Sequence, residues 1–212
     1  MTPVVVVGWT ATFVGAVLGF PQLWRLIRTR SVEGLSLFAW QSILVMNLIW
    51  FAHGVRLDQP PQLVVNTIGA CSTVPIVVLL ARSQGRRLWR VVLPCLVAAV
   101  SIMAIDHFLG SVAFGVAATV PGITSSIGQS VELVRAPHVR GVSAVFMVLA
   151  FVNQLLWLAW GLLIADPGTI ITTAMISVLT GLNLLWYVLR RLGLRAFFAP
   201  GEAVSRRASS AL

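Results

Sequence analysis

Long apolar runs, separated by short polar connections, extend through nearly the whole chain. Seven of these runs are long enough to cross about 30 Å of hydrocarbon as helices. They cover roughly residues 4–26, 37–57, 61–81, 89–106, 108–130, 143–164 and 169–189. The fourth and fifth runs are divided only by a short junction around Asp106 and His107. The pattern predicts an all-α membrane protein with seven transmembrane helices.

The apolar pattern also occurs twice, with an offset of 107 positions and no gap. Shifting the first half by this offset places Gln22 on Gln129 and Trp50 on Trp157. Further identical pairs are Arg28 and Arg135, Gly34 and Gly141, Ser36 and Ser143, Gly54 and Gly161, Pro60 and Pro167, and Thr73 and Thr180. Duplicated helical units that enclose a central site are a common design of membrane transporters.

Both repeats are expected to have the same orientation, because the first loop of each repeat is basic. Three helices per repeat is an odd number, so a parallel arrangement requires one more crossing between the repeats. The segment 89–106 has no repeat partner and supplies that crossing. The predicted 3+1+3 organisation comprises a three-helix bundle over residues 4–81, a linker helix over 89–106, a second bundle over 108–190 and a disordered cytoplasmic tail over 195–212.

Composition and charge support a membrane protein and determine its expected orientation. Hydrophobic residues make up 58% of the chain and charged residues only 10%, so lipid is the solvent that such a surface requires. The net charge of +9 comes from arginines, and fourteen of the fifteen lie in four short regions on one side of the seven spans, near residues 25–30, 82–90, 135–140 and 190–207. Short basic loops stay in the cytoplasm, which places the N-terminus outside and the C-terminus inside. The charge therefore indicates topology rather than a nucleic-acid partner, and arginine-rich short loops favour a bacterial plasma membrane.

Sequence motifs recur in the same order in both repeats. The first repeat contains GFPQLWRLIRTRSVEGLS and LIWFAHGVRLDQPPQLVVNTIG; the second contains SIGQSVELVRAPHVRGVS and LLWLAWGLLIADPGTIITTAMI. The pair Pro21-Gln22, the basic loop, Ser-Val-x-Gly-x-Ser and Trp-x-x-x-Gly resemble the motifs of the SWEET sugar facilitators within the wider PQ-loop (MtN3/saliva) superfamily. The resemblance covers about residues 8–190. It implies a sugar carrier whose two parallel bundles rock around a central pocket.

A hinge at the cytoplasmic end is expected from Pro21 and Gln22, with Gly128 and Gln129 as the counterparts in the second repeat. A proline at that position removes a backbone hydrogen bond and bends the helix. The resemblance implies that this bend opens and closes an inner gate, and a static kink is the alternative. Pro61 is interpreted differently, as part of the first turn of the third helix, where proline is favourable.

A central pocket is predicted from helix geometry. Trp50 and Asn66 each lie eight residues from the middle of one outer loop, at position 58, and Trp157 and Thr173 lie eight residues from the middle of the other, at position 165. At 1.5 Å per residue all four side chains reach a depth of about 12 Å. Indole rings stack on sugar rings, while amides and hydroxyls bond sugar hydroxyls. These are also the four substrate positions that the resemblance implies, although SWEETs usually carry Asn where this chain has Thr173.

Alternatives exist for each pocket residue. The tryptophans could belong to the outer aromatic belt, Asn66 could bond another helix, and Thr173 could bond its own backbone. Asn47 and Gln154, at equivalent positions one turn deeper, could widen the polar wall or join neighbouring helices.

The resemblance implies an outer gate three residues beyond the pocket tryptophans, at His53 and Trp160. Asp58 is close to His53 in sequence and could pair with its imidazolium, which would make the gate respond to external pH. The alternative is a neutral histidine at a helix end. Asp58, Asp106 and Asp166 are all expected in outer loops.

The transport mode follows from charges that are absent. No acidic residue or arginine lies deep within a predicted span, whereas proton-coupled carriers generally need such a relay. Uniport of a small neutral solute, a mono- or disaccharide, is the simplest mechanism. No catalytic, cofactor or metal motif is recognised, so an enzyme is not expected. The alternatives are a carrier of another neutral metabolite, such as an amino acid, and a PQ-loop receptor or scaffold. A Gly15-xxx-Gly19 motif fits a homo-oligomer and close packing within one bundle equally well.

Overall fold

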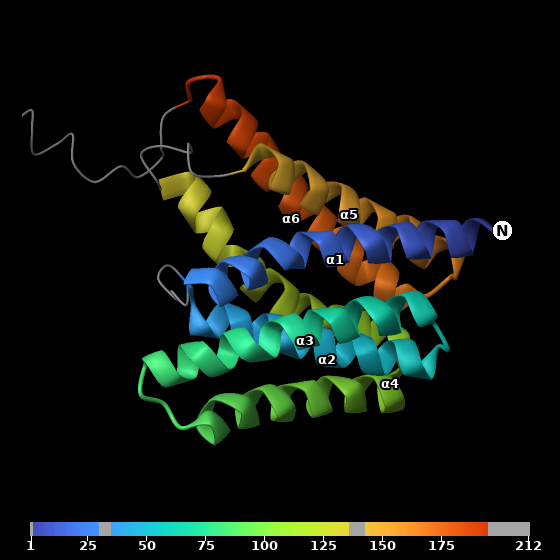
Figure 1. Ribbon diagram of the computed structural model, residues 1–212. Coiled ribbons are helices and arrows are strands. Elements are labelled where there is room, and N and C mark those ends of the chain that lie inside the picture. The colour runs from blue at the N-terminus through green and yellow to red at the C-terminus, as the bar shows by residue number, and fades with distance from the viewer. Residues whose placement is uncertain (1, 30–34, 136–142, 195–212) are drawn as a thin grey trace, which may run out of the picture.

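The computed structural model describes residues 2–29, 35–135 and 143–194. Within these ranges the chain forms six helices and no strand (Figure 1). The helices are α1 (Pro3–Thr29), α2 (Leu37–Arg56), α3 (Pro60–Ser83), α4 (Leu88–Arg135), α5 (Ala144–Leu163) and α6 (Pro167–Arg191). The all-α prediction is therefore confirmed for the described part of the chain.

Helix α4 is divided by Gly110, whose backbone is not helical (φ 84°, ψ 176°). This positive φ is open to glycine because it has no Cβ. The chain reverses there, so the first part of α4 lies along one side of the bundle and the second part returns through it (Figure 1). The predicted junction at Asp106 and His107 is wrong: both residues are helical, and the break comes one turn later.

The helices pack in pairs that follow the sequence repeat. α1 packs on α3 and α5, α2 packs on α3 and α4, and α6 packs on α4 and α5. An offset of 107 residues converts α1, α2 and α3 into the second part of α4, α5 and α6. It therefore converts each contact within the first repeat into one within the second, and converts the α1–α5 contact into the α2–α4 contact. The packing thus has an approximate two-fold relation between the repeats.

The helices have the length and composition of membrane spans. Five described segments are long and apolar enough to cross a bilayer: Leu37–Arg56, Pro60–Ser83, Leu88–Ile127, Ala144–Leu163 and Pro167–Arg191. The segment Leu88–Ile127 contains the break at Gly110, and α1 adds a shorter apolar stretch, Pro3–Leu18. The chain is an all-α integral membrane protein.

The two ends of the bundle differ in charge and in spacing. We call the end formed by residues 57–59, 106–111 and 164–166 the acidic end, because it carries Asp58, Asp106 and Asp166. The opposite end, near residues 82–90 and 190–194, is the basic end. The helices lie close together at the acidic end and diverge toward the basic end (Figure 1).

Candidate functional site

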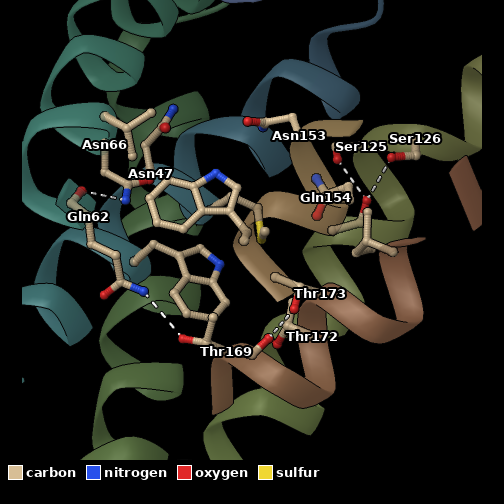
Figure 2. Close-up of a pocket in the computed structure, with 16 residues that line it drawn as sticks. Asn47, Gln62, Asn66, Ser125, Ser126, Asn153, Gln154, Thr169, Thr172 and Thr173 are labelled. Atoms are coloured by element: carbon tan, nitrogen blue, oxygen red, sulfur yellow. Dashed lines mark hydrogen bonds between the residues drawn. The ribbon is translucent and has the colours of Figure 1, made fainter. Parts of the chain in front are cut away.

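A cavity of about 240 Å³ lies between the two repeats (Figure 2). Its walls come from α2, α3, the second part of α4, α5 and α6. The lining residues are Met46, Asn47, Trp50, Gln62, Val65, Asn66, Gly122, Ser125, Ser126, Asn153, Gln154, Trp157, Thr169, Thr172, Thr173 and Ile176. All six residues that the sequence nominated for substrate binding are among them. The structure therefore brings together Trp50, Asn66, Trp157, Thr173, Asn47 and Gln154.

Equivalent residues of the two repeats meet at one wall of this cavity. The side-chain amide of Gln62 donates a hydrogen bond of 3.3 Å to the hydroxyl of Thr169, its counterpart 107 positions later (Figure 2). The approximate two-fold axis therefore passes between these side chains. Gly54 and Gly161 support this arrangement, because a Cβ at either position would come within 2.9 Å of Gln62 or Thr169, respectively. Each glycine lets the second helix of its repeat approach the third closely.

The hydroxyl groups of the cavity mainly offer acceptor lone pairs. Ser125 and Ser126 both donate to the carbonyl of Gly122, at 2.8 and 3.1 Å. Thr172 donates to the carbonyl of Gly115 at 2.9 Å, and Thr173 donates to a carbonyl of its own helix at 2.6 Å. A hydroxyl that has given its proton to the backbone still accepts from a ligand. These four side chains are thus suited to a ligand that donates several hydrogen bonds.

The side-chain amides of the cavity add donors and further acceptors. Asn66 donates one N–H to the carbonyl of Gln62, at 2.8 Å, and makes no interhelical hydrogen bond to any residue that the structure describes. Asn47 donates to the hydroxyl of Thr73 on α3 at 3.2 Å, which joins α2 to α3. Asn153 is buried, and its Oδ1 has no hydrogen-bond partner among the described residues. A ligand that donates a hydrogen bond there would satisfy an otherwise orphaned acceptor.

The indole groups form the flat part of the lining. Trp50 is buried and packs edge-on against Phe114, with ring centroids 5.0 Å apart. Trp157 packs edge-on against Trp160, at 5.3 Å. Trp160 is fully buried behind Trp157 and does not line the cavity. The aromatic-belt interpretation does not hold for Trp50, whereas Trp89 is exposed at the basic end.

The charged side chains near the cavity are gathered at the acidic end instead of lining it. Among the described residues that line the cavity, none is Asp, Glu, Lys or Arg. His53 is fully buried and bonds Asp106 through Nδ1 at 2.7 Å and Asp166 through Nε2 at 2.9 Å. Arg56 closes the group with an ion pair of 2.7 Å to Asp106.

The pairing expected between His53 and Asp58 is wrong. Both ring nitrogens of His53 are occupied by other carboxylates, and Asp58 is exposed in the turn between α2 and α3. The expected loop position of Asp106 is also wrong, since this residue is buried within α4. Its charge is tolerated in an apolar helix because Arg56 and His53 face it.

Asp166 holds the start of α6. As the N-cap residue it accepts a hydrogen bond from the backbone N–H of Thr169 at 2.8 Å and another from the Thr169 hydroxyl at 2.7 Å. Ser111 bonds the second carboxylate oxygen and in turn accepts from the backbone N–H of Gly168. Burial alone would raise the pKa of Asp166, but the hydrogen bonds from His53, Ser111 and Thr169 hold this pKa well below its ordinary value.

Two parts of the sequence prediction fall outside these contacts. The proposed inner gate at Pro21, Gln22, Gly128 and Gln129 belongs to α1 and α4, but these side chains lie outside the described residues. No metal-binding cluster of His, Cys, Asp and Glu is present in the described part of the chain.

Sequence reasoning missed several lining residues. Gln62 and Thr169 could have been found, because each lies four residues before a nominated residue, Asn66 or Thr173, and so shares its helix face. Ser125 and Ser126 gave no such signal, since their counterparts in the first repeat are Leu18 and Gly19.

Comparison with known proteins agrees with this architecture. Residues 4–63 match the family model of the PQ loop repeat. The fold resembles that of a eukaryotic SWEET transporter with a TM-score of 0.70 and 13% sequence identity, over 91% of this chain and the full length of the other. No curated protein matches the chain in sequence. The chain therefore carries one PQ loop repeat, in the part where its motifs predicted it, and its fold resembles that of a SWEET transporter.

Proposed function

We propose that this protein is a carrier that moves a neutral sugar across the membrane by facilitated diffusion. It crosses the membrane seven times, with bundles 4–81 and 108–190 joined by the linker helix 89–106. The acidic end faces outward and the basic end faces the cytoplasm, as the arginine distribution requires. The observation that carries the proposal is an uncharged cavity between the repeats that combines indole surfaces with hydroxyl and amide groups.

The lining favours a sugar over an amino acid. A zwitterionic amino acid needs partners for a carboxylate and an ammonium group, and the described lining offers no charged side chain for either. A sugar needs an apolar face and many neutral hydrogen-bonding groups, which Trp50, Trp157 and the surrounding hydroxyls and amides provide. The cavity volume of about 240 Å³ lies just below the usual range of about 300–1,000 Å³ for ligand pockets. We therefore favour a monosaccharide over a disaccharide.

The shape of the bundle supports alternating access. The acidic end is closed by buried side chains, including His53, Gln62 and Trp160, while the helices diverge toward the basic end (Figure 1). This arrangement corresponds to a carrier closed on the outside. Rocking of the two bundles that separates Gln62 from Thr169 would expose the cavity to the other side. Binding by neutral groups alone favours uniport.

Tracer flux into proteoliposomes tests the proposal. We expect glucose or a related monosaccharide to equilibrate without an ion gradient, and sucrose to enter more slowly. Trp50→Ala and Asn66→Ala should each reduce flux at least about tenfold, because each removes a wall group worth over about 1.4 kcal/mol. Trp89→Ala and Thr67→Ala are the matched controls, since both side chains are exposed outside the cavity. Absence of sugar flux from folded protein would contradict the proposal and favour another solute or a receptor.

A further inference from the structure

The contacts within the buried cluster of His53, Asp106, Asp166 and Arg56 indicate how many protons His53 and the two carboxylates share. Each ring nitrogen of His53 faces a carboxylate oxygen, at 2.7 and 2.9 Å. A neutral imidazole has one N–H and one lone pair, and its lone pair would repel an ionised carboxylate. Two protons are therefore required along the line from Asp106 through His53 to Asp166.

Both carboxylates also accept from other donors, an arrangement that suits two carboxylates on either side of an imidazolium. Asp166 already accepts from Thr169 N–H, Thr169 hydroxyl and Ser111 hydroxyl. Asp106 receives the guanidinium of Arg56 through Nε at 2.9 Å and through Nη2 at 2.7 Å. The group thus balances two positive charges, on His53 and Arg56, against two negative ones.

The surroundings of His53 contain no other charged partner among the described residues. Phe114 stacks on the imidazole with centroids 4.2 Å apart and planes 10° apart, and Trp50 meets its edge. Asp58 and His107, the remaining titratable side chains of this end, are exposed. The described parts of α1, α3 and α5 have no charged side chain at this end. Asp106, Asp166 and Arg56 are therefore the charged groups that surround His53 in the described part of the chain.

The cluster joins parts of the molecule that belong to different halves. His53 and Arg56 lie on α2, and the first part of α4, which carries Asp106, packs against α2 through a shared apolar core that includes Ile49 and Ala99. Asp166 belongs to the second repeat, where it caps α6. Opening of the acidic end would keep His53 with Asp106 and Arg56 but separate it from Asp166.

We propose that His53 is a proton-binding site that locks the acidic end: closure takes up one proton and opening releases it. The inference rests on the proposed alternating-access function. In the closed state the imidazolium neutralises both carboxylates. In the open state Arg56 alone neutralises Asp106, and the second ring proton has lost its acceptor. Acidic conditions then favour closure, and alkaline conditions favour opening. The carrier is thereby regulated by the pH outside, even though the transported sugar is neutral.

Distances between spin labels test this inference directly. Labels on Gln59→Cys and Leu163→Cys, in a chain with Cys71→Ala and Cys95→Ala, report the separation of the two halves at the acidic end. Between pH 5 and 8 we expect the closed-to-open ratio to fall, by up to about tenfold per pH unit for one linked proton. His53→Gln should abolish this dependence, because its amide does not titrate. A control pair of labels on Gln59 and Gln84, at the two ends of α3, should give the same distance at every pH.

The outcomes separate the lock from the proposed transport. The inference would be overturned if the closed-to-open ratio of the parent chain does not change with pH. It would also be overturned if the ratio still changes with pH in His53→Gln. If His53→Gln does not fold, Asp166→Asn decides in its place, because it keeps the histidine and removes the negative charge that the lock requires, so the pH dependence should weaken. No sugar is present in this experiment. A pH-dependent distance without sugar flux would support the proton site and contradict the sugar carrier. Sugar flux with a distance that does not change with pH would support the carrier and contradict the proton site.

Discussion

The buried carboxylate of Asp166 should contribute more to stability than the exposed carboxylate of Asp58 at the same end. Its two oxygens receive hydrogen bonds from His53, Ser111 and both the backbone and the hydroxyl of Thr169. Replacing it with alanine removes the cap of α6, leaves the half-buried Ser111 hydroxyl and the buried Thr169 donors without their acceptor, and leaves His53 facing a gap. Asp58, exposed in the neighbouring turn, provides a matched control of the same chemistry.

The magnitude follows from the kinds of contact that are lost. Loss of an N-cap side chain costs about 0.5–2 kcal/mol. Removal of one partner from a buried ion pair costs about 3–5 kcal/mol, and the contacts at one carboxylate are not additive. We expect Asp166→Ala to lower the free energy of unfolding by about 4 kcal/mol. For a chain of this size that corresponds to a drop in Tm of about 8–16 °C. Asp58→Ala should change stability by less than about 0.5 kcal/mol.

Thermal unfolding in detergent, followed by tryptophan fluorescence, checks this prediction. Asp166→Asn should fall between the parent and Asp166→Ala, because its amide oxygen still accepts the N–H of Thr169 while its NH₂ group cannot accept from Ser111. The reasoning is refuted if Asp166→Ala and Asp58→Ala unfold at the same temperature. It is also refuted if Asp166→Asn is as stable as the parent chain, since the carboxylate charge would then contribute nothing.

Three further predictions concern the cavity and its acidic end. Thr173→Val should raise the half-saturation concentration for the sugar about threefold to tenfold in the flux assay, because it removes an acceptor worth about 1 kcal/mol. Thr180→Val is the control: it loses a similar hydrogen bond to the backbone away from the cavity and should leave the half-saturation concentration unchanged. Gly161→Val should lower the free energy of unfolding by about 1–3 kcal/mol and reduce flux, because even a Cβ at this position would lie 2.8 Å from Thr169. Normal flux in this variant would show that transport does not need the close approach of the two helices. The difference in stability between the parent and Asp166→Ala should persist from neutral pH down to about pH 4 and shrink below it, because a carboxyl group whose pKa is lowered by folding loses its contribution only as pH falls through that lowered value. Unfolding curves between pH 3 and 7 measure this, and a difference that disappears near pH 6 would contradict it.

Much of the fold was predictable because it depends on patterns that the chain repeats. The offset of 107 residues placed Trp50 and Trp157 at equivalent depths, and an antiparallel helix pair with a short turn must bring Asn66 to the depth of Trp50. These inferences needed only helix geometry. The cavity accordingly contains all six nominated residues.

The errors arose where long-range contacts decide the structure. Asp106 in an apolar segment was interpreted as a loop residue, because a lone carboxylate is costly in a membrane helix. Its partners lie 50 and 53 residues earlier in the chain, and no local pattern indicates that pairing. Asp58 was considered as a partner of His53 only because it is near in sequence. The junction was predicted at the polar pair Asp106 and His107, whereas the break lies at Gly110, whose positive φ suits glycine.

The contact between Gln62 and Thr169 also bears on how such a protein evolves. In a symmetric dimer of single repeats, the two-fold axis would set identical side chains against each other, glutamine on glutamine or threonine on threonine. Covalent fusion of the repeats removes that constraint, since each copy then mutates independently. Here one copy supplies the donor and the other the acceptor, and the acceptor hydroxyl in turn donates a hydrogen bond to Asp166. Fusion of the repeats in one chain thus allows a hydrogen bond across the axis with a fixed direction, from the first repeat to the second, which the symmetry of two identical subunits does not allow.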